Sequence, residues 1–379
     1  MPCMEVYLDN AATTQVRAEA VEKMLSAMQD GYGNPSSTHR AGRGAAKLLA
    51  AARESVASAL GAATCEICFT SGGTEADNWA ILSSAEAGQR GGRHMITSSA
   101  EHEAVLAPAR KLESLGWEVD YLAPDSTGRV PADSLSDALR GDTALVSIML
   151  VNNETGAVNP VEEYARIIKK RGSGAMLHTD AVQGLGKIPI NVNALGADLV
   201  SVSAHKIHGP KGAGALYIKR GTKLPAMFAG GGQESGRRAG TEALPAIAGF
   251  GEAARLAHIE LEEASRAVRY LREYAAGLLA AAIPRAIIIG EGDSPYILSF
   301  SLPGARSEVL MNYLDGEGVC VASGAACGKG ARSHVLKAMK LKDSVIAGAL
   351  RVSFSRYSTK TEAEYLVDKL RTAYETLRR

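Results

Sequence analysis

The chain has 379 residues, of which 46% are hydrophobic and 22% charged, the composition of a soluble globular protein with a sizeable core. Its 42 Lys and Arg residues nearly balance its 41 Asp and Glu residues, and the net charge of +1 argues against a nucleic-acid binder, which would carry a basic excess. No apolar run approaches the roughly 20 residues that a membrane span needs. The amino terminus shows no secretory signal, so we expect a protein without a membrane partner.

The chain opens with helical spacing at residues 15–30 and 42–60, separated by the Gly-, Asn- and Pro-containing loop 31–39. Strand-like runs then alternate with helical patterns, as expected for βαβ units and a mostly parallel sheet. The runs lie at residues 67–70, 94–97, 119–122, 144–151, 176–178, 199–202 and 214–218.

A long helical pattern at residues 243–282 separates this part from a smaller α+β unit. Strands are predicted there at 286–289, 297–301 and 350–354, helices at 307–316 and 333–339, and a last helix after Thr359, whose spacing to Glu362 is that of a capping box. We therefore expect a large domain of residues 15–255 and a small domain formed by residues 1–14 and 256–379.

The five cysteines are sparse and odd in number, which fits a reduced, cytoplasmic setting better than a disulfide framework. Cys65 and Cys68 are three residues apart on a predicted strand, where their side chains point to opposite faces, and no second pair completes a metal site. Cys327 differs, because it lies in a loop of small residues with nothing apolar to pack against. An exposed thiol of that kind is a candidate nucleophile.

Lys206 follows the apolar run 199–202 and precedes a Gly- and Pro-rich turn. A buried ammonium group is costly without a partner. Two readings remain open from this stretch alone: a strand-end lysine that points to solvent, or a lysine held as a Schiff base with an aldehyde cofactor.

Two further features bear on that choice. The turn Ser71–Thr74, with Gly73 inside it, joins a predicted strand to a predicted helix, where backbone amides and the helix dipole bind phosphate. Asp180 follows a central strand, and it is either a helix N-cap or the partner of a protonated pyridine nitrogen. Together with Lys206, these features indicate pyridoxal 5'-phosphate, with Ser203 and His205 as additional phosphate donors.

Three more residues suit such a site, each with an ordinary alternative. His102 follows a strand-like run and is either an ordinary surface or core residue or a group that stacks on the cofactor ring. Arg351 enters an apolar strand and is either a strand-edge residue or a bidentate clamp for a substrate carboxylate. Asn34, in the loop 31–39, is a candidate to assist it from the other domain.

The ordered motifs YLDNAATT, GNPSSTHRAGR, FTSGGTEADN, EHEAV, VNNETG, HTDAVQ, SAHKIHGPKG, GGGQESGRRAGTE, SGAAC and LRVSFSRY run nearly from end to end. In these motifs the chain resembles the cysteine desulfurases of the iron–sulfur-cluster and nitrogenase-maturation type, within the class V aminotransferases. The resemblance implies an α/β fold, the fold-type I pyridoxal-phosphate transferase, with a mostly parallel seven-stranded sheet covered by helices on both faces.

The resemblance also implies roles for individual residues. Lys206 would bind the cofactor aldehyde, Asp180 its pyridine nitrogen and Gln183 its ring oxygen, while His102 would stack on the ring and act in proton transfer. Cys327 would accept sulfur from L-cysteine as a persulfide, with L-alanine as the other product. The implied phosphate ligands are Gly73, Thr74, Ser203 and His205, joined by Thr241 of the partner subunit in a homodimer, and the implied carboxylate ligands are Asn34, Asn153 and Arg351.

The cysteine loop reads ASGAACGKG where the family usually has SSGSACTS, and Ala204 replaces a common glycine. These departures remove no chemical group that the reaction needs, but they leave the sulfur-acceptor protein open: an iron–sulfur scaffold, a tRNA-thiolation carrier or another. Rival functions are a selenocysteine lyase or β-lyase, which need no loop thiol, an aminotransferase, and a cofactor-free scaffolding relative.

Overall fold

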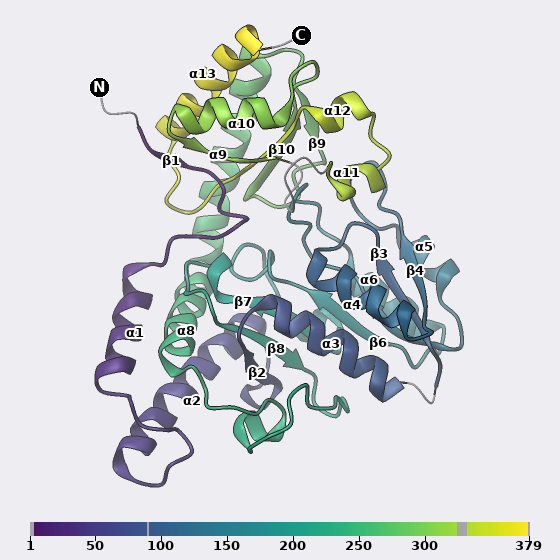
Figure 1. The fold of residues 1–379 in the computed structure, drawn as a ribbon, viewed down its shortest axis with the longest axis vertical. Coiled ribbons are helices and arrows are strands. Elements are labelled where there is room, and N and C mark those ends of the chain that lie inside the picture. The colour runs from purple at the N-terminus through teal and green to yellow at the C-terminus, as the bar shows by residue number, and fades with distance from the viewer. Residues whose placement is uncertain (1–3, 89–90, 324–331, 378–379) are drawn as a thin grey trace.

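The computed structural model describes residues 4–88, 91–323 and 332–377, which form three sheets with flanking helices (Figure 1). The large sheet has seven strands in the order β2-β8-β7-β6-β5-β3-β4. Only β8 is antiparallel to its neighbours, so the expected mostly parallel sheet is confirmed. Its strands are β2 (Ile67–Thr70), β3 (His94–Ser98), β4 (Glu118–Leu122), β5 (Thr143–Ser147), β6 (Met176–Asp180), β7 (Leu199–Ser203) and β8 (Gly214–Ile218).

Helices cover both faces of this sheet because apolar side chains alternate along its strands. Leu199 packs with residues of α3 on one face, whereas Val200 and Val202 pack with residues of α2, α6 and α8 on the other. The helices of this part are α1 (Ala18–Gln29), α2 (Arg40–Leu60), α3 (Gly73–Gly88), α4 (Glu103–Ser114), α5 (Ala132–Ala138), α6 (Val161–Lys170), α7 (Val192–Leu195) and α8 (Leu244–Ile259). Short 3₁₀ turns lie at Thr64–Glu66, Ala204–Lys206 and Gln233–Gly236.

The smaller unit, at the top of Figure 1, contains a four-stranded antiparallel sheet in the order β12-β13-β10-β9. Both ends of the described chain lie in this unit, where β1 pairs with β11 in parallel. Its elements are β1 (Val6–Tyr7), α9 (Leu261–Ala282), β9 (Ile287–Ile289), β10 (Ile297–Ser301), α10 (Ser307–Gly316), β11 (Val319–Cys320), β12 (Ala322–Ser323), α11 (His334–Ala338), α12 (Asp343–Ala347), β13 (Ala349–Ser353) and α13 (Lys360–Leu377).

The sequence did not predict β1 or α12, and two predicted elements differ clearly in extent. The helical pattern 243–282 is two helices, because Glu260, with φ −92° and ψ 0°, leaves helical geometry between α8 and α9. The Glu260 carboxylate forms ion pairs with Arg17 and Arg356 at this break. Strand β5 ends at Ser147 rather than at Val151. The division into domains at residue 255 stays a prediction. No described helix is long and apolar enough to span a membrane.

Candidate active site

A cavity of about 520 Å³ opens at the carboxyl ends of the parallel strands, where open α/β sheets bind ligands. Its walls come from both parts of the molecule, since Asp9, Met311 and Arg351 of the smaller unit face residues of the large sheet. The predicted site residues that line it are Gly73, Thr74, His102, Asn153, Asp180, Gln183, Ser203, His205, Lys206 and Arg351. Residues from Gly73 to Arg351, far apart in the chain, therefore share one cavity.

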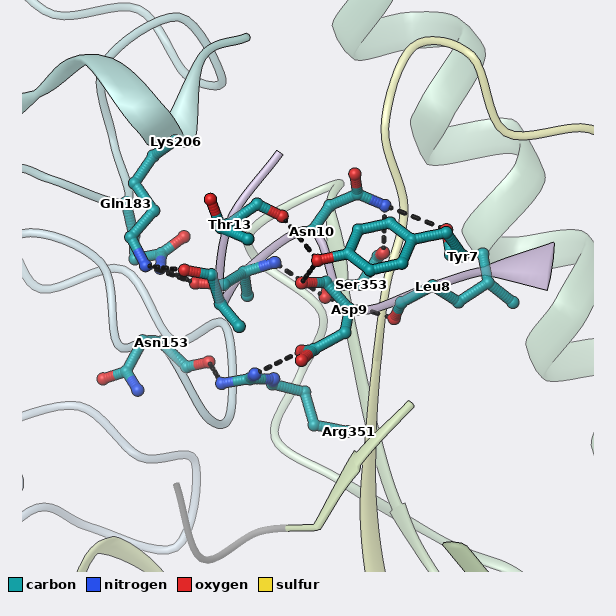
Figure 2. Close-up of polar contacts among 12 residues, drawn as sticks. Tyr7, Leu8, Asp9, Asn10, Thr13, Asn153, Gln183, Lys206, Arg351 and Ser353 are labelled. Carbon is teal, nitrogen blue, oxygen red and sulfur yellow. Dashed lines mark hydrogen bonds and ion pairs between the residues drawn. The ribbon is translucent and has the colours of Figure 1, made fainter. Parts of the chain in front are cut away.

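Lys206 lies in the 3₁₀ turn that follows β7, three residues past the end of that strand at Ser203. Its Nζ donates hydrogen bonds of 2.7 Å to the carbonyl oxygens of Ala11 and Ala12 (Figure 2). Burial, together with the charge of Arg351, lowers the pKa of Lys206 to about 8. The side chain lines the cavity, and a lowered pKa favours the neutral, nucleophilic amine.

Asp180 ends β6 and is buried, with one carboxylate oxygen accepting a 2.8 Å hydrogen bond from the amide of Val182. It therefore both caps the local turn and lines the cavity. Burial, reinforced by the nearby Asp77, raises the pKa of Asp180 to about 7. A cationic partner in the cavity would reverse that shift by favouring the carboxylate.

A hollow continuous with the cavity lies at the start of α3, between the turn Ser71–Thr74 and residues Ser203, His205 and Lys211. The first backbone N–H groups of α3 have no acceptor within the helix, and N–H groups at a helix N-terminus favour a bound anion. The Ser203 hydroxyl is buried and has no hydrogen-bond partner among the described residues. Gly73 is required here, since an added Cβ would lie 2.7 Å from Cγ2 of Val182.

His102 is the N-cap of α4, and its Nδ1 accepts a 3.1 Å hydrogen bond from the amide of Ala104. In the neutral ring the proton therefore resides on Nε2. His205 contacts Thr13 through Nδ1 at 3.2 Å, and burial, with the charge of Lys206, lowers the pKa of His205 to about 4. Both imidazoles line the cavity, His205 as a neutral group.

Arg351 is 2% exposed on β13, and its guanidinium forms two contacts drawn in Figure 2. Nη2 lies 2.7 Å from a carboxylate oxygen of Asp9, and Nη1 donates a 2.9 Å hydrogen bond to the backbone oxygen of Asn153. The strand-edge alternative is wrong, because this arginine is buried and faces the cavity.

Two predicted residues lie outside this cavity, and a third is not described. Asn34 and Thr241 are exposed on loops and do not line this cavity within one chain. Cys327 lies outside the described residues. Of the other cysteines, Cys65 is exposed and Cys68 is buried, and no cluster of three metal-ligating side chains occurs in the described ranges.

Three further groups at the site were not predicted from the sequence. Asp9 pairs with Arg351, Asp77 lies buried on α3 in the cavity wall, and Lys187 donates a 2.6 Å hydrogen bond from Nζ to Oε1 of Gln183. Asp77 carried one available signal, because an acid within the apolar first turns of a helix is rarely buried without purpose. Nothing local marks Asp9, whose partner Arg351 is 342 residues away, and the proximity of Lys187 to Gln183 in the sequence does not show that the two meet at the cavity.

Comparisons with known proteins agree with this geometry. The aminotransferase class-V family model matches residues 6–366. The cysteine desulfurase IscS of Dictyoglomus turgidum is 43% identical over 378 residues, covering 99% of this chain and 95% of that protein. A solved NifS-like protein superposes with a TM-score of 0.93 at 39% identity, covering 99% of this chain and 100% of the other. A structure described as SspA in complex with cysteine has a TM-score of 0.80 at 31% identity, covering 94% of this chain and 100% of the other. The chain belongs to the aminotransferase class-V family and, within it, to the cysteine desulfurases.

Proposed function

We propose that the protein is a pyridoxal-phosphate-dependent cysteine desulfurase that converts L-cysteine to L-alanine and leaves the sulfur on Cys327 as a persulfide. The observation that carries the proposal is the single cavity that gathers Lys206, Asp180 and Arg351. These are an amine for the cofactor aldehyde, an acid for its ring nitrogen and a cation for the substrate carboxylate.

The residues present fit pyridoxal phosphate. Ser203 offers an unpartnered hydroxyl beside the amides that begin α3, which suits the phosphate. Asp180, whose pKa burial raises to about 7, would ionise against a protonated ring nitrogen. A cavity of about 520 Å³ is of the size that small cofactors occupy. When bound, the cofactor would supply an electron sink for the pair left by removal of the Cα proton.

Each remaining step belongs to side chains of this chain. Lys206, with its pKa lowered to about 8, takes the Cα proton as a neutral amine. Nε2 of His102, whose ring is oriented by the Nδ1 hydrogen bond, would exchange a proton with the substrate. Gln183 presents Nε2 toward the Ala11 carbonyl and the cavity, where it would contact the ring oxygen.

The sulfur transfer balances without an added oxidant. The Cys327 thiolate attacks the substrate sulfur, so that an S–S bond forms and the Cβ–S bond breaks. The electron pair of the broken bond stays with the carbon fragment, which takes up a proton and leaves as L-alanine. A reductant or an acceptor protein then removes the persulfide sulfur, which regenerates the thiol.

We further propose a homodimer, in which Thr241 of each subunit reaches the phosphate site of the other. Thr241 is exposed and outside its own cavity, as that role requires. Helix α1 presents a stripe of exposed apolar residues, Val21, Leu25 and Met28, followed by Tyr32, which a partner would cover. The sparse cysteines support a reducing, cytoplasmic location, with an iron–sulfur scaffold or sulfur carrier as the acceptor.

The test is to measure alanine and sulfide formed from L-cysteine, with and without a thiol reductant, in the wild type and in Cys327→Ser. We expect sulfide release to require both the reductant and Cys327, and Lys206→Ala to abolish alanine formation. Full alanine production by Cys327→Ser would exclude the persulfide mechanism and favour a β-lyase.

A further inference from the structure

The segment Asp9–Ala12 lines the cavity and contacts three of its functional side chains (Figure 2). The carbonyl oxygen of Ala11 accepts hydrogen bonds from Nζ of Lys206 and from Nε2 of Gln183, at 2.7 and 2.8 Å. The carboxylate of Asp9 lies 2.7 Å from Nη2 of Arg351. Backbone groups thus hold the lysine and the amide, whereas a charged side chain holds the arginine.

The contacts of Arg351 engage both terminal nitrogens of its guanidinium and pair its charge with that of Asp9. A carboxylate is gripped most firmly by two parallel N–H groups of a guanidinium. Here Nη2 is paired with Asp9 and Nη1 donates to the Asn153 backbone, while Nε is buried without a hydrogen-bond partner among the described residues. An incoming α-carboxylate therefore meets a guanidinium whose charge is already paired with the Asp9 carboxylate.

The two members of this pair differ in their freedom to move. The Arg351 side chain is 3% exposed, whereas that of Asp9 is 23% exposed and lines the cavity. The Asp9 backbone is fixed by a parallel bridge to Ser353 and by the amide of Asn10, which donates to the Ser353 oxygen at 3.3 Å. Only the Asp9 side chain needs to rotate for the pair to open, while the segment stays in place.

We infer that Asp9 determines substrate specificity at this site: its carboxylate occupies the clamp of Arg351 until the α-carboxylate of an amino acid replaces it. The inference rests on the proposed role of Arg351 as the carboxylate clamp. The exchange keeps one carboxylate beside the buried guanidinium throughout, because a buried cation without a counter-charge is costly. A ligand without a carboxylate has nothing to offer Arg351 in return and leaves Asp9 in place.

Binding of L-alanine to the holoenzyme tests the exchange, because the product carries the same carboxylate but no sulfur to transfer. Dissociation constants would be measured by calorimetry for the wild type, Asp9→Asn, Asp9→Glu and Arg351→Ala. We expect Asp9→Asn to bind L-alanine roughly 5- to 150-fold more tightly, the range of an ordinary coupling between two sites. Asp9→Glu, which retains the competing charge, should stay closer to the wild type.

The matched control is Glu5→Gln, which removes the same charge from an exposed position four residues earlier in the chain. It should leave L-alanine binding unchanged. Cysteamine, which lacks the carboxylate, should gain no affinity from Asp9→Asn.

Equal or weaker L-alanine binding by Asp9→Asn, together with lost binding by Arg351→Ala, would overturn the inference and leave Arg351 as the clamp. Undiminished binding by Arg351→Ala would overturn the proposed clamp and the inference with it. Because Asp9→Asn leaves a buried guanidinium without its counter-charge, thermal unfolding gives a second measurement. Saturating L-alanine should raise the Tm of Asp9→Asn by more than that of the wild type, and an equal or smaller rise contradicts the exchange.

Discussion

Nζ of Lys187 lies 2.6 Å from Oε1 of Gln183, and the lysine is 5% exposed. Since Lys187 donates to the oxygen and Nε2 donates to the Ala11 carbonyl at 2.8 Å, the orientation of the Gln183 amide is fixed at both atoms. Burial, with the charges of Lys206 and Arg351, lowers the pKa of Lys187 to about 7. Lys187 is therefore a positioning residue that turns the Gln183 donor toward the cavity.

Replacing Lys187 by Met removes this donor and leaves the Gln183 oxygen buried without a partner. We expect the affinity of the apoprotein for pyridoxal phosphate to fall roughly tenfold, the equivalent of one hydrogen bond. The measurement is a titration of the apoprotein with the cofactor. Lys169→Met, on the exposed end of α6, is the control and should bind normally. Unchanged affinity of Lys187→Met would show that Gln183 needs no such support.

The rate at which the apoprotein takes up pyridoxal phosphate should depend on the protonation of Lys206. Only the neutral amine attacks an aldehyde, and burial followed by the charge of Arg351 lowers the pKa of Lys206 to about 8. Uptake should therefore rise with pH up to about 8 and level off above it. Mixing apoprotein with cofactor at a series of pH values, followed by visible absorbance, measures the midpoint.

In Arg351→Ala the same midpoint should move to higher pH, because a cation that disfavours the ammonium form has been removed. A wild-type midpoint near the ordinary lysine pKa of roughly 10.4 would contradict the lowered value.

Asp77 should destabilise the apoprotein in a pH-dependent manner. Burial raises the pKa of Asp77 to about 7, so the unfolded chain ionises this group at a lower pH than the folded one does. Its Oδ1 has no hydrogen-bond partner among the described residues, and Nε2 of His178 is 3.5 Å away. Unfolding releases the group to ionise, and stability therefore falls as the pH rises from about 4 to 7.

Asp77→Asn should remove that fall and make the apoprotein more stable than the wild type at pH 7 by ~1–3 kcal/mol. At pH near 4, where the wild-type group is protonated in both states, the difference should shrink. Denaturant unfolding at several pH values measures it. A difference in stability between Asp77→Asn and the wild type that is the same at every pH would contradict the prediction, because it would not depend on the ionisation of Asp77.

Local sequence patterns determined most of the secondary structure. The strand at residues 67–70 was predicted with its observed bounds, because its apolar residues lie between helix-forming and turn-forming segments. The capping box at Thr359 is confirmed by the 3.2 Å hydrogen bond from the Glu362 amide to the Thr359 hydroxyl. Such features depend on neighbours in the chain, and so the chain alone reveals them.

The sequence also identified the family, because many ordered motifs point to one set of chemical groups. It could not determine where those groups meet. The long helical pattern 243–282 carries no Pro at its centre, and the break at Glu260 depends on Arg17 and Arg356, which lie far from it in the chain.

The same reason separates what the sequence determined at the site from what the tertiary structure decided. Lys206, Asp180 and the turn at Gly73 are recognisable because each stands at a strand end beside its own turn. The pairing of Asp9 with Arg351 joins positions 342 residues apart. Lys187 and Gln183 are only four residues apart in the sequence. Their hydrogen bond serves the site because the Gln183 amide also donates to the carbonyl oxygen of Ala11, a residue remote in the chain. Charge pairs and buried polar contacts depend on distances that only the folded chain establishes.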